Sequence, residues 1–266
     1  MPDDVTRVAL LTSGETLPAW AADAVERMVA ETPARITLEV RDASTSERSP
    51  VETLHRAVEL REWAVVGGLA EVLSREIEPL ERRRVADLPG IEDAERIACE
   101  PETVDGWKNA LPDPAVERLT ETDVAVRFGF GFLVGDALTA PERGVLSFHH
   151  GNLREYRGQP MGFWEYVHGR ETAGVTLQRL NETLDGGEIV AERRIRIGDA
   201  PTWRAVRRRL FAASEPMLAD GVRNLRDPDF EPESLAEEEL GDLYTLPKGQ
   251  PVLIFVEKTA RGALLG

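Results

Sequence analysis

Two histidines and an acidic glycine loop are the residues of this chain best suited to chemistry. Residues 147–158 read SFHHGNLREYRG and include His149 and His150, and residues 184–187 read LDGG and include Asp185. An imidazole and a carboxylate brought together can polarise a carbonyl and move a proton. We therefore expect a site for carbonyl chemistry built around His149 and Asp185.

The strand pattern at residues 144–149 assigns the two histidines to different faces. Because side chains alternate along a strand, Val145, Ser147 and His149 are expected on one face and His150 on the other. A pair of adjacent histidines is often only structural. Ligands of α/β proteins, however, bind outside the carboxyl ends of the strands, and this position favours a functional His149.

Strands and helices alternate along the chain in the way that builds a parallel sheet. An α/β, Rossmann-like fold is therefore expected, with a mostly parallel central sheet and helices on both faces. Residues 69–119 give no clear pattern. Apolar runs predict strands at 7–11, 36–40, 63–68, 122–127, 144–149, 172–180 and 188–197, and helical patterns occur at 18–29, 53–60, 161–168 and from Pro201 to about Leu225.

Charge and composition exclude several classes of partner. The 266 residues carry a formal net charge of −16 with only three lysines, which disfavours nucleic acid and anionic membranes. No apolar run approaches the roughly 20 residues of a membrane span, the N-terminus is unlike a signal peptide, and Cys99 is the single cysteine. We expect a cytoplasmic protein without a metal site. Many carboxylates with few lysines favour a halophile over an ordinary acidic protein.

Residues 128–132 read FGFGF and lack the full glycine fingerprint of a dinucleotide-binding loop. Apolar residues around glycines suit a flat aromatic ligand whose ring lies against the backbone. No phosphate-binding P-loop, zinc-binding His-Glu-x-x-His or nucleophile elbow occurs in the chain. The motifs therefore favour a pocket for a flat aromatic ligand over a nucleotide-binding or metal-binding site.

Together these segments resemble the formyltransferase family that uses 10-formyltetrahydrofolate, which includes glycinamide ribonucleotide transformylase and the catalytic domain of methionyl-tRNA formyltransferase. The family pattern is Asn-x-His-x-Ser-Leu-Leu-Pro-x-Tyr/Trp-Arg-Gly, followed by Pro-x-x-Trp, Thr-Gly-Val-Thr and Leu-Asp-x-Gly. The resemblance covers about residues 122–225 well and the first strands loosely. The chain has SFH at 147–149, YRG at 156–158, PMGFW at 160–164, AGVT at 173–176 and LDGG at 184–187, in the same order and at matching spacing.

The resemblance implies roles for individual residues. His149 would polarise the formyl carbonyl, Asp185 would orient and charge His149, and Ser147 stands where the family has its catalytic Asn. Serine is shorter, and losing one oxyanion donor costs about 10²–10³ in rate, so His150 or Asn152 would have to compensate, or the substrate geometry would differ. By the same resemblance, the pterin would lie against Phe130, Gly131, Phe132, Leu133, Glu182, Thr183 and Leu184, while His150, Asn152, Arg157 and Gly158 would contact substrate or position loops.

The function implied is transfer of a formyl group from 10-formyltetrahydrofolate, as co-substrate, to a primary amine of a small molecule. Residues 11–15 lack a glycine loop for phosphate, which weakens glycinamide ribonucleotide and leaves an amino sugar nucleotide or another purine-pathway intermediate. Hydrolysis of 10-formyltetrahydrofolate, and folate binding without turnover, stay open as alternatives. We expect a formyltransferase domain over residues 1–226. Residues 227–266 are expected to be an acidic linker and a short appendage, too short for a tRNA-binding barrel.

Overall fold

The computed structural model describes residues 5–44 and 78–265. The helix expected at 53–60 and the strand expected at 63–68 lie outside the described residues. Within them, the other expected strands are present with bounds shifted by one or two residues, and the expected helices are present with one exception described below.

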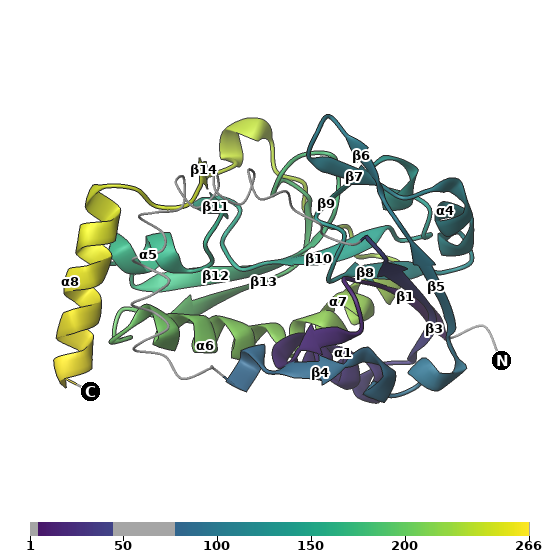
Figure 1. Ribbon diagram of the computed structural model, residues 1–266, viewed down its shortest axis with the longest axis horizontal. Coiled ribbons are helices and arrows are strands. Elements are labelled where there is room, and N and C mark those ends of the chain that lie inside the picture. The colour runs from purple at the N-terminus through teal and green to yellow at the C-terminus, as the bar shows by residue number, and fades with distance from the viewer. Residues whose placement is uncertain (1–4, 45–77, 266) are drawn as a thin grey trace.

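The described residues form a central seven-stranded sheet (Figure 1). Across the sheet the strands are β13 (Glu188–Arg196), β12 (Thr172–Arg179), β10 (Val145–His149), β8 (Val124–Arg127), β1 (Thr6–Thr12), β3 (Ala34–Asp42) and β5 (Glu95–Cys99). The strands from β10 to β5 are parallel, and β12 and β13 are antiparallel to their neighbours. The expected α/β fold with a mostly parallel sheet is confirmed.

Helices cover both faces of this sheet, and β1 shows how the sequence produces two cores. Val8 and Leu10 pack into one core with α1 (Ala19–Glu31), α6 (Trp203–Ser214) and α7 (Met217–Arg226). Ala9 and Leu11 face the other core, which includes α4 (Asp113–Leu119). A strand buried on both faces needs apolar residues at every position. Figure 1 shows α1, α6 and α7 on one side of the sheet and α4 on the other.

The single helix expected from Pro201 to about Leu225 is wrong, because the structure has two. Helix α6 begins at Trp203, after Thr202, whose side chain accepts a hydrogen bond from the backbone N–H of Ala205 at 3.2 Å. It ends at Ser214, and α7 begins after Pro216. Proline has no backbone N–H and clashes with the preceding turn of a helix, so Pro216 separates the two segments.

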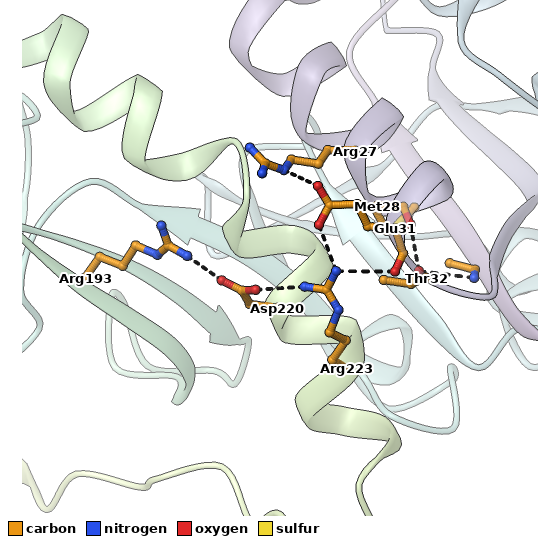
Figure 2. A network of polar contacts seen from close by, with 8 residues as sticks. Arg27, Met28, Glu31, Thr32, Arg193, Asp220 and Arg223 are labelled. Atoms are coloured by element: carbon orange, nitrogen blue, oxygen red, sulfur yellow. Dashed lines mark hydrogen bonds and ion pairs between the residues drawn. The ribbon is translucent and has the colours of Figure 1, made fainter.

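An ion-pair network joins the end of α1 to α7 and β13, on the face of the sheet that α1 and α7 cover (Figure 2). Glu31 accepts hydrogen bonds from Arg27 at 2.5 Å and from Arg223 at 2.8 Å. Arg223 also donates to Asp220 at 3.0 Å, and Asp220 accepts from Arg193 at 2.5 Å. Five side chains with alternating charge therefore link three elements that are far apart in sequence.

Short elements complete the described chain. Residues 227–265 contact the rest of the molecule: β14 (Asp242–Tyr244) pairs with β11 (Tyr156–Gly158), and Phe255 of α8 (Gln250–Leu265) lies 5.4 Å from Phe163 between ring centroids. The domain boundary at 226 stays a prediction.

The remaining elements are β2 (Thr16–Pro18), β4 (Arg82–Arg84), β6 (Glu102–Val104), β7 (Lys108–Ala110), β9 (Phe132–Val134), α5 (Phe163–Val167) and 3-10 turns at 78–80, 85–87, 91–93, 135–138 and 237–239.

Candidate active site

The structure brings His149 and Asp185 together. Nδ1 of His149 lies 3.3 Å from Oδ1 of Asp185, and Nε2 lies 3.0 Å from the backbone carbonyl oxygen of Tyr156. Gly151 makes the second contact possible, since a Cβ there would lie 2.4 Å from Nε2. The glycine in the segment 147–158 therefore permits the orientation of the imidazole.

Electrostatics favour the charged form of this histidine. Burial alone lowers the pKa of His149, but the hydrogen bond and charge of Asp185 and the Tyr156 carbonyl outweigh it, so the pKa of His149 is raised. Burial likewise raises the pKa of Asp185, but His149 and the Gly158 N–H reverse the shift, so this pKa is lowered. Both shifts favour the ion pair of an imidazolium and a carboxylate. Glu165 on α5 is buried nearby, and burial raises its pKa to about 7.

The loop that carries Asp185 is held in a specific conformation. Asp185 has a left-handed backbone, with φ of 46°, which is uncommon outside glycine. Its Oδ2 accepts a hydrogen bond from the Gly158 N–H at 2.7 Å. Arg157 donates to the carbonyl of Leu184 at 3.3 Å and to that of Gly241 at 2.7 Å. Arg157 and Gly158 thus fix the carboxylate opposite His149.

Ser147 lies on the same face of β10 as His149 and is bonded to a residue that the motif analysis missed. Arg127, at the end of β8, is the cross-strand neighbour of Ser147, and its Nη2 donates to Ser147 Oγ at 2.9 Å. Its Nη1 donates to the Gly131 carbonyl. The sequence shows Arg127 as a single charge ending the apolar run Val124–Val126, but its contact with Ser147 depends on the pairing of β8 with β10.

His150 does not reach this site. It lies on the opposite face of the sheet, with its ring centroid 5.0 Å from that of Trp20, and its Nε2 is 2.9 Å from Ser214 Oγ. Burial lowers its pKa to about 3, with smaller contributions from His149 and Arg207. His150 is therefore a half-buried residue on the face opposite His149, the face that the alternation along the strand predicted.

Asn152 is close to the site, and its amide is partly engaged by neighbours in the chain. Its Oδ1 accepts from the Arg154 N–H at 2.9 Å, and one of the two Nδ2 hydrogens is donated to Glu155 Oε1 at 3.3 Å. Its backbone also packs against β12, since a Cβ on Gly174 would lie 2.6 Å from the Asn152 nitrogen. In this conformation Asn152 shapes the turn after β10.

The residues assigned to the pterin divide into two groups. The side chains of Phe130 and Leu133 are buried in the core with α4, whereas Phe132 is half-buried with its ring centroid 4.9 Å from that of Trp107. Glu182, Thr183 and Leu184 are exposed. Glu182 lines a cavity of about 700 Å³ between the segments 135–144 and 179–182. Of the residues assigned to the pterin, Glu182 therefore lines this cavity, and Phe130 and Leu133 lie in the core.

Residues 5–44 and 78–265 contain neither a metal site nor a membrane-spanning helix. No group of three or more His, Cys, Asp or Glu side chains in these ranges has the arrangement of a metal site. No helix in the same ranges is both long and apolar enough to cross a bilayer.

Solved structures with the same fold are formyl-transferring and deformylating enzymes. Glycinamide ribonucleotide transformylase 1 from Symbiobacterium toebii superposes with a TM-score of 0.52 at 17% identity, covering 84% of this chain and 88% of that one. An N-formyltransferase from Helicobacter canadensis gives 0.57 at 9% identity, over 97% and 80% of the chains. A formyltetrahydrofolate deformylase from Pseudomonas syringae gives 0.54 at 19% identity, over 85% and 63%. At these identities the likeness shows the fold.

The sequence places the chain within a family. The family model described as formyl transferase matches residues 69–222, and the chain belongs to this family. The methionyl-tRNA formyltransferase of Bacillus mycoides is 28% identical over 134 residues, which are 50% of this chain and 43% of the relative. The matched part is thus less than half the length of the curated relatives.

Proposed function

We propose that this protein transfers a formyl group from 10-formyltetrahydrofolate to the primary amine of a small molecule. The observation that carries the proposal is the buried His149–Asp185 pair at the end of β10, at 3.3 Å, in a chain of the formyl transferase family. A charged imidazole fixed by a carboxylate supplies the positive charge that acyl transfer needs at a developing oxyanion.

The overall step balances without a further reactant. The amine nitrogen forms a bond to the formyl carbon, the bond between that carbon and N10 of the folate breaks, and one proton passes from the amine to N10. We assign the relay of this proton to Asp185, whose Oδ1 contacts His149 Nδ1 and whose Oδ2 accepts from the Gly158 N–H. His149 keeps its positive charge beside Ser147 throughout.

The molecule has a cavity of suitable size for the ring system of 10-formyltetrahydrofolate. The cavity between the segments 135–144 and 179–182 has a volume of about 700 Å³, which is in the range of small-molecule sites. It borders Glu182, at the start of the loop that ends in Asp185. We assign the folate to this cavity and to the exposed segment Glu182, Thr183 and Leu184. Gly131 and Phe132 would border it at the start of β9. The buried Phe130 and Leu133 would support that segment from the core.

The acceptor is proposed to be an amino sugar nucleotide. The structure of the Helicobacter canadensis N-formyltransferase, which has the same fold, contains folinic acid and dTDP-3-aminofucose. The curated relatives are methionyl-tRNA formyltransferases, but a formal charge of −16 opposes binding of a polyanion. A small amine fits the charge better than tRNA does.

The test is incubation of the purified protein with 10-formyltetrahydrofolate in molar KCl, following release of tetrahydrofolate. The acceptors are amino sugar nucleotides, glycinamide ribonucleotide, initiator methionyl-tRNA and no amine. We expect release only with an amino sugar nucleotide. Release without any amine would show hydrolysis instead, and folate binding without release in any arm would show a binding protein.

A further inference from the structure

Both ring nitrogens of His149 already face acceptors. Asp185 Oδ1 lies 3.3 Å from Nδ1, and the Tyr156 carbonyl lies 3.0 Å from Nε2. A carboxylate and a carbonyl oxygen accept hydrogen bonds and donate none, so each contact uses one N–H of the imidazolium. In this arrangement His149 contributes charge but has no N–H left to donate to a formyl oxygen.

The direct donor must therefore come from another residue on this face of the sheet. Asn152 lies beyond β10, in a turn where Arg154 and Glu155 hold its amide oxygen and one of its two amide hydrogens, and His150 lies on the other face, bonded to Ser214. Ser147 lies on the strand itself, two positions before His149 and on the same face of β10. Its Oγ accepts from Arg127 Nη2 at 2.9 Å, and a hydroxyl that accepts one bond still has its own hydrogen to donate.

Arg127 is held in the site by two of its three guanidinium nitrogens. Its Nη1 donates to the Gly131 carbonyl and its Nη2 to Ser147 Oγ. Its Nε is buried and has no hydrogen-bond partner among the described residues. A guanidinium keeps its charge when buried, and Asp185 is close enough to interact with it electrostatically.

We propose that the Ser147 hydroxyl donates the hydrogen bond to the formyl oxygen and that Arg127 orients this hydroxyl. Together the two residues would take the part of the Asn amide that the formyltransferase family has at the position of Ser147. The inference rests on the proposed function. The guanidinium occupies a lone pair of Oγ, which directs the hydroxyl hydrogen away from Arg127, and its positive charge makes the hydroxyl a stronger donor. Arg127 acts through Ser147, so the two residues form one unit.

The experiment is a double-mutant cycle with Arg127→Met and Ser147→Ala, measuring kcat and the KM for 10-formyltetrahydrofolate with the best acceptor. Each single variant is expected to lower kcat by about 10²-fold, the usual loss for one oxyanion donor, with KM for the donor within threefold. The double variant is expected to be no more than threefold slower than either single. Added methylguanidinium is expected to restore part of the rate of Arg127→Met but not of Ser147→Ala.

Arg7→Met is the matched control, because Arg7 lies at the start of β1, at the opposite end of the strands, paired with Asp123. It is expected to leave kcat unchanged. Thermal unfolding of every variant excludes general loss of structure. A single variant within threefold of wild type, or a double variant whose losses multiply to about 10⁴, would overturn the inference.

A binding measurement separates this inference from the proposed function. The probes are 10-formyl-5,8-dideazafolate and the same molecule without its formyl group, titrated into each protein in the absence of amine. We expect wild type to bind the formylated probe more tightly, and Arg127→Met and Ser147→Ala to lose that difference. If wild type transfers no formyl group in any assay, the proposed function fails, and this difference alone decides whether Ser147 and Arg127 bind a formyl oxygen. An unchanged difference in the variants would reject the inference.

Discussion

The protonation of His149 is set by what its two nitrogens touch. A buried imidazole loses free energy by carrying charge, and burial alone would keep His149 neutral. The Asp185 carboxylate and the Tyr156 carbonyl are both acceptors, at 3.3 and 3.0 Å, and together they reverse that preference. The partner of His150, one residue later, is the uncharged Ser214 hydroxyl, which donates to the Leu210 carbonyl and accepts from Nε2, so burial lowers the pKa of His150. The pKa values of the two adjacent histidines therefore shift in opposite directions because their partners differ.

Asp185→Asn tests the control of His149. The substitution keeps the shape of the side chain but removes its charge, so burial becomes the main influence on His149. We expect the pKa of His149 to fall below the ordinary value of about 6.5 and turnover at neutral pH to fall by about 10²–10⁴-fold, the usual contribution of general acid–base catalysis. Histidine-selective NMR over a pH series measures the pKa. Asp199→Asn, which breaks a surface pair with Arg209, is the control and should move neither quantity.

His150 predicts a defined dependence of stability on pH. Its pKa is about 3 in the folded protein and about 6.5 in the unfolded chain, so only the unfolded chain binds this proton between those values. The free energy of unfolding therefore falls by about 1.4 kcal/mol per pH unit as pH decreases from about 6.5. His149 acts oppositely, since its raised pKa adds stability below about pH 6.5 that is lost as pH rises through its folded value.

Urea unfolding of His150→Leu and of wild type between about pH 7 and pH 5 isolates this effect. In this range the histidine begins to titrate in the unfolded chain. The variant keeps His149 and all carboxylates, so their contributions cancel in the comparison. We expect the stability of wild type to fall more steeply with decreasing pH than that of the variant, by about 1.4 kcal/mol per unit. Parallel curves would show that the pKa of His150 is the same in the folded and unfolded states.

At the scale of elements, the sequence predicted what depends on local pattern and missed what depends on distant partners. The longer strands and helices between 122 and 225 have regular apolar periodicity, and the break at Pro216 and the three-residue strands β9 and β11 were overlooked. The segment 78–119 forms β4 to β7 and α4, mostly as three-residue strands too short to show a period. The orientation of His149 depends on the space above Gly151, and the role of Arg127 depends on pairing between β8 and β10. Neither can be obtained from single-strand patterns.

Gly158 is the point where two elements and the Asp185 loop meet. It lies in β11 with φ of 86°, and a Cβ there would lie 1.9 Å from the carbonyl oxygen of Tyr244 in β14. Gly158→Ala must therefore separate β11 from β14 and disturb the N–H that holds Asp185. We expect a loss of more than about 2 kcal/mol in the free energy of unfolding, combining backbone strain with steric overlap, and a loss of turnover.

Gly90→Ala is the matched control for this prediction. Gly90 also has a positive φ, 78°, but a Cβ there would meet nothing within 4 Å. It should cost only the backbone term of about 1–2 kcal/mol and leave turnover unchanged. Equal losses from the two variants would mean that the contact between β11 and β14 contributes nothing beyond backbone strain.

At the scale of the whole molecule, charge has two opposing effects on stability. Surface pairs such as those joining Arg27, Glu31, Arg223, Asp220 and Arg193 (Figure 2) stabilise the fold. Their side chains are roughly a third to a half exposed, and such pairs contribute about 0.2–1 kcal/mol each, less as salt rises. The excess of carboxylates acts against the fold through long-range repulsion. Salt weakens both effects, and the net charge of −16 makes repulsion the larger one.

We therefore expect the melting temperature to rise markedly between about 0.01 M and 1 M KCl, as the Debye length falls from about 30 Å to about 3 Å. Sorbitol at matched osmolality is the control for general exclusion effects and should raise it less. The double variant Glu237→Gln and Glu238→Gln removes two exposed carboxylates from the acidic segment and should reduce the salt dependence without changing the value in 1 M KCl. A melting temperature that is flat or falls with salt would mean that the local pairs outweigh the repulsion, and would reject adaptation of this surface to high salt.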